Sequence, residues 1–348
     1  MKEIDQKIIE WHNQNKNIAI ATLVKVYGSA PQPLGAKMAI TEDLEFTGSV
    51  SGGCVEGDVI EQAQQVIKSS SPKLIGYGVS DDSAWNLGLS CGGTIEVFVE
   101  PFTSLHEKII ELQHNHDLFA VITVLNGNRI GEKQIIFPMD LTDDENKGLI
   151  QHPGIRDMAF RVFQNQKSEK FDVRLENEEC QIFCEVISPP MRLIIIGAVH
   201  IAMPLVELAR LMNFSTILVD PRSTFANRDR FPTVDQIVVG WPAEELEKLE
   251  IDENTFITFI SHDEKLDVPA LQKALNSKAR YIGVFGSRKT HAGRVEKLLE
   301  LGVSAESLAR LHAPIGLDIG AAGAQEIALA IIAEMIAIRN GKFFPGKS

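Results

Sequence analysis

The sequence predicts an α/β protein of two domains: an N-terminal α/β domain with a mixed sheet over residues 1–188, and a doubly wound parallel-sheet domain over residues 189–348. The length of 348 residues suits two domains of ordinary size. Pro189 and Pro190 form a natural hinge, because consecutive prolines stiffen a linker and end a strand. After this hinge, short apolar runs alternate with helical stretches, which is typical of a parallel sheet covered on both faces.

The composition excludes several classes of protein. Apolar residues make up 44% of the chain and charged residues 23%, which excludes a disordered chain, a collagen-like repeat and a coiled-coil rod. The net charge of −13 argues against binding to nucleic acid or to an anionic membrane. Four cysteines are too few for a disulfide framework, and residues 1–17 lack the apolar segment of a secretory signal. We therefore expect a cytoplasmic protein with reduced thiols.

The N-terminal domain is expected to begin with a helix and a sheet. Residues 2–15 have the spacing of an amphipathic helix, and the β-rich run that begins at Ile18 ends at Gly28 and Pro31. The segment from 140 to 178 is polar and is expected to be irregular. The other expected elements are strands at 36–41, 45–50, 73–79, 94–100, 120–125, 134–137 and 181–187, a helix at 55–69 and a loop at 80–93.

The C-terminal domain is expected to alternate strictly between strands and helices. Apolar runs rich in Ile, Val and Phe predict the strands, and the segments between them have helical spacing. The expected strands are 192–197, 215–220, 235–240, 255–260 and 280–285, and the expected helices are 200–212, 243–250, 266–277, 288–301 and 323–339.

The first strand of this domain leads into an incomplete dinucleotide fingerprint. Gly197 follows the strand and Asp220 ends the next one, where an acid could meet a ribose hydroxyl. Val199 stands where the second glycine should allow close approach of a pyrophosphate. The pattern therefore predicts a Rossmann-like fold. It leaves open whether a dinucleotide binds there, or whether Asp220 simply pairs with Arg222.

A glycine–cysteine turn is the sharpest local feature of the N-terminal domain. A strand runs into Gly52 and Gly53, and Cys54 stands where the next helix begins. Free amides and the positive end of the helix favour an anion there, either a ligand phosphate or a thiolate. Such a thiolate suits a soft metal, with Lys37 as a possible second cation. Alternatively, Cys54 is a small buried residue and Lys37 is a solvated strand lysine.

The other cysteines differ in their context. Cys91 precedes Gly92 and Gly93, so it could converge with Cys54 on one soft ligand or could be a packing residue. Cys180 and Cys184 lie four residues apart in an expected strand, too far apart for a local disulfide, and are expected to be structural.

Four separated stretches together resemble the xanthine dehydrogenase accessory family, XdhC/CoxI. They cover nearly the whole chain, and the last of them is long enough to be specific. The stretches are residues 28–31 with 35–38, residues 51–56, residues 91–93 with Glu100-Pro101, and a C-terminal stretch made up of residues 193–202, 220–222 and 312–320.

This resemblance implies a chaperone of the molybdenum cofactor, a carrier more than a catalyst. Such proteins bind the pterin-based cofactor, assist exchange of a terminal oxygen for sulfur, and deliver it to a molybdenum hydroxylase. The implied partners are a xanthine dehydrogenase-like enzyme, a cysteine desulfurase and a second copy of the chain. Cys54 matches the family's cofactor-binding cysteine and is the expected metal ligand. The full set of expected cofactor-binding residues is Gly52, Gly53, Cys54, Glu56, Cys91, Gly197, His200, Asp220, His312 and Asp318.

Two other functions stay open at this point. The Rossmann-like half and Asp220 would suit an NAD(P)-dependent oxidoreductase, against which Val199 counts. A protein-interaction scaffold with inert cysteines is the third hypothesis.

Overall fold

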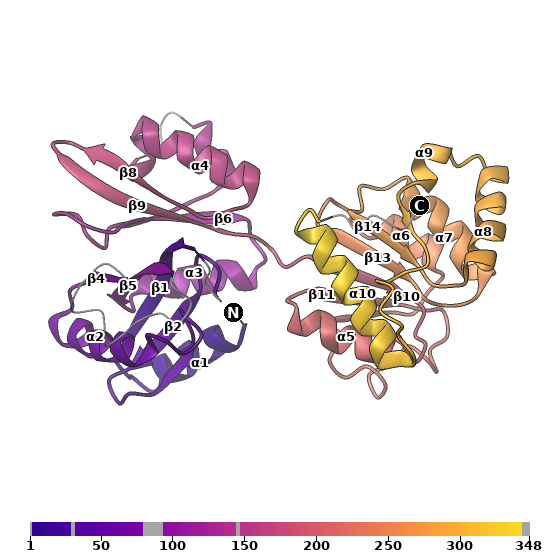
Figure 1. Cartoon of the computed structure of the whole chain (residues 1–348), viewed down its shortest axis with the longest axis horizontal. Helices are drawn as coiled ribbons and strands as arrows, with labels where there is room; N and C mark the ends of the chain where they lie inside the picture. The colour runs from indigo at the N-terminus through magenta and orange to yellow at the C-terminus, as the bar shows by residue number, and fades with distance from the viewer. Residues whose placement is uncertain (1, 29–31, 79–92, 144–146, 343–348) are drawn as a thin grey trace. The chain divides into compact units, whose positions relative to one another are not determined.

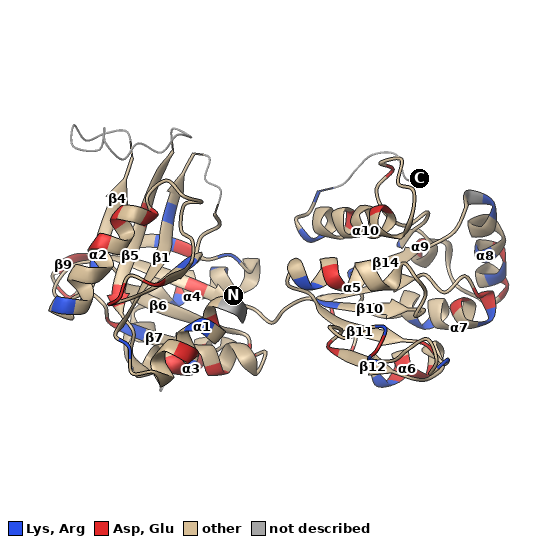
Figure 2. Cartoon of the chain, turned by 90° about the horizontal axis from the view of Figure 1, so that it is seen from below, with Lys and Arg blue, Asp and Glu red and all other residues tan. Residues whose placement is uncertain are grey.

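The chain forms two compact units, residues 1–189 (unit 1) and 190–348 (unit 2) (Figure 1). The computed structural model describes residues 2–28, 32–78, 93–143 and 147–342. The α/β class and the Rossmann-like second half that the sequence predicts are confirmed. Acidic and basic residues are interspersed along the elements of both units (Figure 2).

The first sheet of unit 1 is buried on both faces. Alternate residues of its central strand point to opposite sides, so Ile18 and Ile20 pack against helix α1 while Ala19 and Leu23 pack against helix α2. The strand order is β3-β2-β1-β5-β4. The bounds are α1 Lys2–Asn13, β1 Ile18–Tyr27, β2 Lys37–Thr41, β3 Phe46–Gly48, α2 Glu56–Ser69, β4 Lys73–Tyr77 and β5 Thr94–Pro101.

The second sheet of unit 1 has the order β7-β6-β9-β8 and lies between helices α3 and α4. Phe119 and Val121 of β6 pack against α3, whereas Ala120 and Ile122 pack against α4. The bounds are α3 Ser104–His114, β6 Phe119–Val124, β7 Lys133–Ile136, the 3-10 helices η2 Pro138–Leu141 and η3 Leu149–Gln151, α4 Pro153–Asn165, β8 Glu169–Leu175 and β9 Glu178–Ile187.

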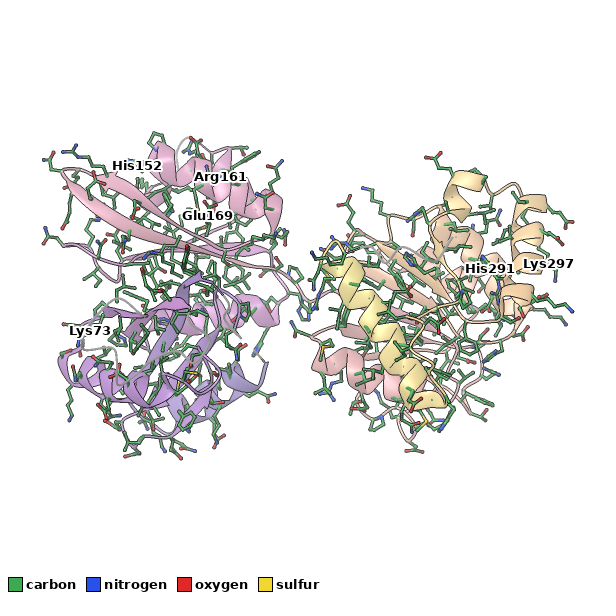
Figure 3. All side chains as sticks on the ribbon, in the orientation of Figure 1. Lys73, His152, Arg161, Glu169, His291 and Lys297 are labelled. Atoms are coloured by element: carbon green, nitrogen blue, oxygen red, sulfur yellow. The ribbon has the colours of Figure 1, made fainter. Side chains whose placement is uncertain are left out.

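Two expectations for unit 1 are wrong. Every strand pair described in it is antiparallel, so its two sheets replace the expected mixed sheet; short turns such as the one between β2 and β3 allow only antiparallel pairing. The segment from 140 to 178 is not irregular, because it contains α4 and β8. Arg161 of α4 and Glu169 of β8 come within 3.6 Å (Figure 3).

The two sheets of unit 1 meet along an apolar cluster and three ion pairs. Val24 and Phe98 of the first sheet pack against Leu125 and Phe183 of the second. Buried ion pairs need close partners to offset the desolvation of both charges. The pairs that join the sheets are Lys37–Glu185 and Lys133–Glu100, at 2.7 and 2.9 Å, and Lys170–Glu96.

Unit 2 is a single parallel sheet with the order β12-β11-β10-β13-β14-β15. Helices α5 and α10 cover one face, and α6, α7 and α8 cover the other. The order reverses between β10 and β13, which is where ligands bind in sheets of this kind. The bounds are β10 Arg192–Ile196, α5 Ala202–Leu211, β11 Ser215–Val219, β12 Gln236–Val238, α6 Pro242–Lys248, β13 Thr255–Phe259, α7 Glu264–Leu275, β14 Tyr281–Val284, α8 Arg288–Glu300, α9 Ala305–Leu308, β15 Leu311–His312 and α10 Ala324–Arg339.

Gly197, directly after β10, is required by the neighbouring backbone. Its φ is +108°, and a Cβ there would lie 2.6 Å from Cα of Ser261, which follows β13. We predict that Gly197→Ala lowers the free energy of unfolding by about 2 kcal/mol or more, because the clash is with backbone. Gly293→Ala is the matched control: a Cβ there meets open space on α8, so it should raise stability by about 0.5–1 kcal/mol. Urea unfolding measures both, and equal effects would contradict this account.

Candidate functional site

The turn that carries Cys54 is closed by the carboxylate of Glu56, the first residue of α2. Ser49 and Ser51 each donate a hydroxyl hydrogen bond of 2.5 Å to it. Backbone amides complete the ring of donors, at 2.9–3.2 Å. They are the amides of Val50, Ser51, Gly52, Gly53 and Val55.

This geometry contradicts the expectation that the amides of the turn are open to a ligand phosphate. Glu56 occupies the anion position itself and thereby organises the turn. Burial raises the pKa of Glu56, but the hydrogen bonds from Ser49 and Ser51 outweigh burial and lower the pKa to about 2. The carboxylate is thus ionised at neutral pH.

Cys54 lies half-buried at the edge of this turn. It packs against the core cluster that contains Val55 and Val59, and its amide donates to Ser51 Oγ at 3.0 Å. Gly53 beside it has a φ of +116°, and nothing described lies within 4 Å of where its Cβ would be. Among the described residues, the turn is therefore open on the side of Gly53. Cys91 lies outside the described residues.

Lys37 fills neither of the roles that the sequence suggests. Its ammonium is 2.7 Å from the carboxylate of Glu185 on β9, and the lysine side chain is only 19% exposed. It is therefore a paired cation of the contact between the sheets, not a solvated lysine and not a partner of Cys54 in this structure.

Cys180 and Cys184 are buried in β9, which agrees with the structural role expected of them. Burial raises the pKa of both thiols, in Cys184 to about 12. They therefore stay protonated and unreactive at neutral pH. Within the described residues, no group of three or more His, Cys, Asp or Glu is placed to hold a metal ion.

In unit 2, Asp220 closes the turn after β10. It is fully buried, and its carboxylate accepts hydrogen bonds from the amide of Ala198 at 2.7 Å and from the guanidinium of Arg222 at 2.6 and 2.8 Å. Burial raises its pKa, but these hydrogen bonds outweigh burial and lower it. The geometry favours the pairing of Asp220 with Arg222 over contact with a ribose. His200 is exposed on the same turn.

The loop after β15 is held by Glu334, a buried acid on α10 that the sequence expectations do not include. Its carboxylate accepts from the hydroxyl of Tyr281 at 2.5 Å and from the amide of Gly316 at 2.8 Å, and it lies 3.5 Å from Nδ1 of His312. Asp318 is exposed and lines a cavity of about 410 Å³ between this loop, the end of β14 and α10. His312 thus links the loop to α10 through Glu334, whereas Asp318 faces the cavity. A single acid within the apolar run of residues 327–338 is the signal for Glu334.

Two family models match this chain. Residues 11–78 match the XdhC and CoxI family, and residues 193–335 match the XdhC Rossmann domain. The chain belongs to the XdhC and CoxI family.

Two relatives of this XdhC/CoxI chain are similar to it over most of their own length. A protein of Bacillus subtilis described as a probable xanthine dehydrogenase subunit is 29% identical, over 92% of this chain and 93% of its own. The molybdenum cofactor insertion chaperone PaoD of Escherichia coli is also 29% identical, over 93% of this chain and 84% of its own. A crystal structure of a xanthine dehydrogenase from Bacillus halodurans superposes with a TM-score of 0.78 at 28% identity, covering 97% of this chain and 96% of that one.

We predict that Glu56→Gln lowers the free energy of unfolding at neutral pH by about 1–3 kcal/mol, since an amide cannot accept all the charge-assisted bonds of the turn. The folded pKa of about 2 lies below the ordinary value of 4.5, so the stabilisation is present above pH 4.5 and is lost as the pH falls toward 2. Glu56→Gln should flatten the pH dependence of stability in that window. Glu61→Gln, an exposed acid on the same helix, is the control; equal curves for the two variants would contradict the role of Glu56.

The carboxylate of Asp220 is already paired with Arg222, and Val199 stands at a glycine position of the fingerprint. We therefore also predict weak nucleotide binding. Calorimetric titration of the protein with NAD(H) and NADP(H) should show no micromolar binding. Saturable micromolar binding with hydride transfer would instead support the oxidoreductase alternative.

Proposed function

We propose that this protein carries the molybdenum cofactor as cargo and delivers it to a xanthine dehydrogenase-like hydroxylase. The observation that carries the proposal is Cys54, a half-buried thiol on a braced turn with open space at Gly53. Similarity to the insertion chaperone PaoD along nearly the whole chain supports a chaperone role. The match of the second half to the XdhC Rossmann domain supports the same family role.

The chemistry of the turn suits a reversible metal bond. A thiolate is a soft ligand, of the kind that soft transition metals prefer. Glu56 holds the turn in one shape before any cargo arrives, so little conformational entropy is lost on binding. Because Cys54 supplies one ligand and the described residues add no metal-binding cluster, the bond can be exchanged when the cargo is handed over.

The finer parts of the proposal concern the partners. The protein presents the cofactor in the cytoplasm while a terminal oxygen is exchanged for sulfur supplied by a cysteine desulfurase, and it acts as a homodimer. It is a carrier rather than a catalyst. In the described part of the chain, no helix is both long and apolar enough to cross a bilayer.

We predict that Cys54→Ala strongly reduces retention of the cofactor. After incubation with molybdenum cofactor and gel filtration, the molybdenum content per chain should fall by about ten-fold or more relative to the wild type, as is common when a ligand environment is disrupted. Elemental analysis of the protein peak measures this molybdenum content. Cys180→Ala, which removes a buried thiol elsewhere in unit 1, should retain the wild-type content. Equal retention by the Cys54→Ala variant would overturn the site.

A further inference from the structure

The outward face of α10 in unit 2 is apolar, although a helix at a protein surface normally carries its charged residues on the solvent side. The charged residues of α10 are Glu326, Glu334 and Arg339. Glu334 is buried, and Arg339 is half-buried and donates to the carbonyl of Met212 at 3.3 Å. Glu326 is exposed, but it lies in the first turn. Residues 327–338 therefore present no exposed charged side chain.

One stripe of this face is open to solvent at helical spacing. Leu329 is 51% exposed, and the half-buried Ala333 and Ile336 follow it at intervals of four and three positions. Residues three and four positions apart lie on the same face of a helix. Gln325 and Asn340, both exposed, continue the stripe at its two ends. The stripe thus has an apolar centre and a polar amide at each end.

Exposed apolar surface continues onto α5, which lies beside α10 on the same face of the sheet (Figure 2). Leu211, at the end of α5, is 74% exposed. The bond from Arg339 to the carbonyl of Met212 places the carboxyl ends of the two helices together. Neither Leu211 nor Leu329 belongs to the apolar cluster beneath the helices. Single exposed apolar residues are common, but a contiguous apolar face marks an interaction surface.

The order of residues along the stripe is symmetric. Leu329 and Ile336 are equally distant from the midpoint of residues 332–333, and so are Gln325 and Asn340. In a dimer with a two-fold axis, residue i of one copy meets residue j of the other, and j meets i. A two-fold axis at this midpoint therefore places Leu329 against Ile336 of the other copy twice, with the amide side chains at the ends of the contact.

Charge and side-chain size also favour an antiparallel pair. Glu326 is in the first turn of α10 and Arg339 in the last, so antiparallel helices place unlike charges at the same end, whereas parallel helices place like charges together. The helix dipoles are likewise opposed. Ala333, next to the midpoint, is small enough for the two helix axes to approach to about 8 Å. Since each copy carries a net charge of −13, this face is also one where two copies repel each other little.

We propose that a second copy of this chain packs on α10, antiparallel and about a two-fold axis beside Ala333, with Leu211 at the edge of the contact. The inference rests on the proposed function for the existence of a homodimer, and it names the surface that forms it. Because Cys54 lies in unit 1 and α10 in unit 2, the contact uses no residue that we assign to the cargo.

A cysteine at the two-fold axis tests the arrangement. In Ala333→Cys the new thiols of the two copies should lie within the Cα–Cα range of about 4.4–6.8 Å that a disulfide requires. Incubation of the full-length protein with oxidised glutathione should then give a covalent dimer on a non-reducing gel, beyond any that the wild type forms through its own cysteines. Ala292→Cys, at an exposed alanine of α8 on the opposite face of the sheet, is the matched control. Equal yields of covalent dimer from the two variants would contradict the arrangement.

A charge on the stripe tests the surface. Leu329→Lys should raise the dissociation constant of the dimer at least about ten-fold, measured by sedimentation over a range of protein concentrations. Leu299→Lys is the matched control, since Leu299 lies on α8 and is 49% exposed, against 51% for Leu329. Thermal unfolding of both variants confirms that they fold. Equal dissociation constants for the two variants, or a wild type that is monomeric at every concentration, would overturn the proposal.

The failure of this proposal is distinguishable from the failure of the proposed function. If the wild type is a dimer but neither Ala333→Cys nor Leu329→Lys behaves as expected, the surface is wrong while the homodimer stands. If the wild type is monomeric yet retains molybdenum through Cys54, the surface and the homodimer are wrong while the carrier function stands. If the dimer forms through α10 but no cofactor is retained, the surface stands and the carrier function is wrong.

Discussion

The carboxylate of Glu56 determines the shape of the turn on which Cys54 stands. Five amides and two hydroxyls converge on it, so the glycine-rich segment between β3 and α2 has one conformation without any ligand. A turn of this composition would otherwise have many accessible conformations, because glycine restricts the backbone least. The same bonds keep Glu56 ionised. The position of the thiol at the edge of this turn, with open space at Gly53, follows from that constraint.

Buried acids in unit 2 also hold a turn and a loop by accepting hydrogen bonds from backbone amides. Asp220 accepts from the amide of Ala198 in the turn after β10, and Glu334 accepts from the amide of Gly316 in the loop after β15. In each case a carboxylate takes an amide that a bound anion could have used. In a chain with a net charge of −13, this arrangement limits the places where an anionic cargo can be held. Cys54 is the group of unit 1 that we assign to the cargo.

The sequence was informative where hydrophobic patterns are long and regular. The alternation after Pro190 predicts the parallel sheet of unit 2, because strands buried on both faces appear as continuous apolar runs. It failed between residues 140 and 178, where the apolar face of α4 is short and surrounded by polar segments. Ile155, Met158, Ala159 and Val162 have helical spacing and could have revealed that helix. The sequence identified Cys54 and its turn, but it could not show that Glu56 folds back onto the amides. It also could not show that Lys37 pairs with Glu185, since the two lie 148 positions apart and meet only when the sheets pack.

The central claim is that Cys54 binds the metal of the cargo directly. X-ray absorption at the molybdenum edge, measured on the protein with bound cofactor, tests it most directly. The account predicts a sulfur neighbour of molybdenum beyond those of the cofactor itself, which is lost when any residual cofactor on the Cys54→Ala variant is measured. An identical sulfur shell in the wild type and in Cys54→Ala would contradict it.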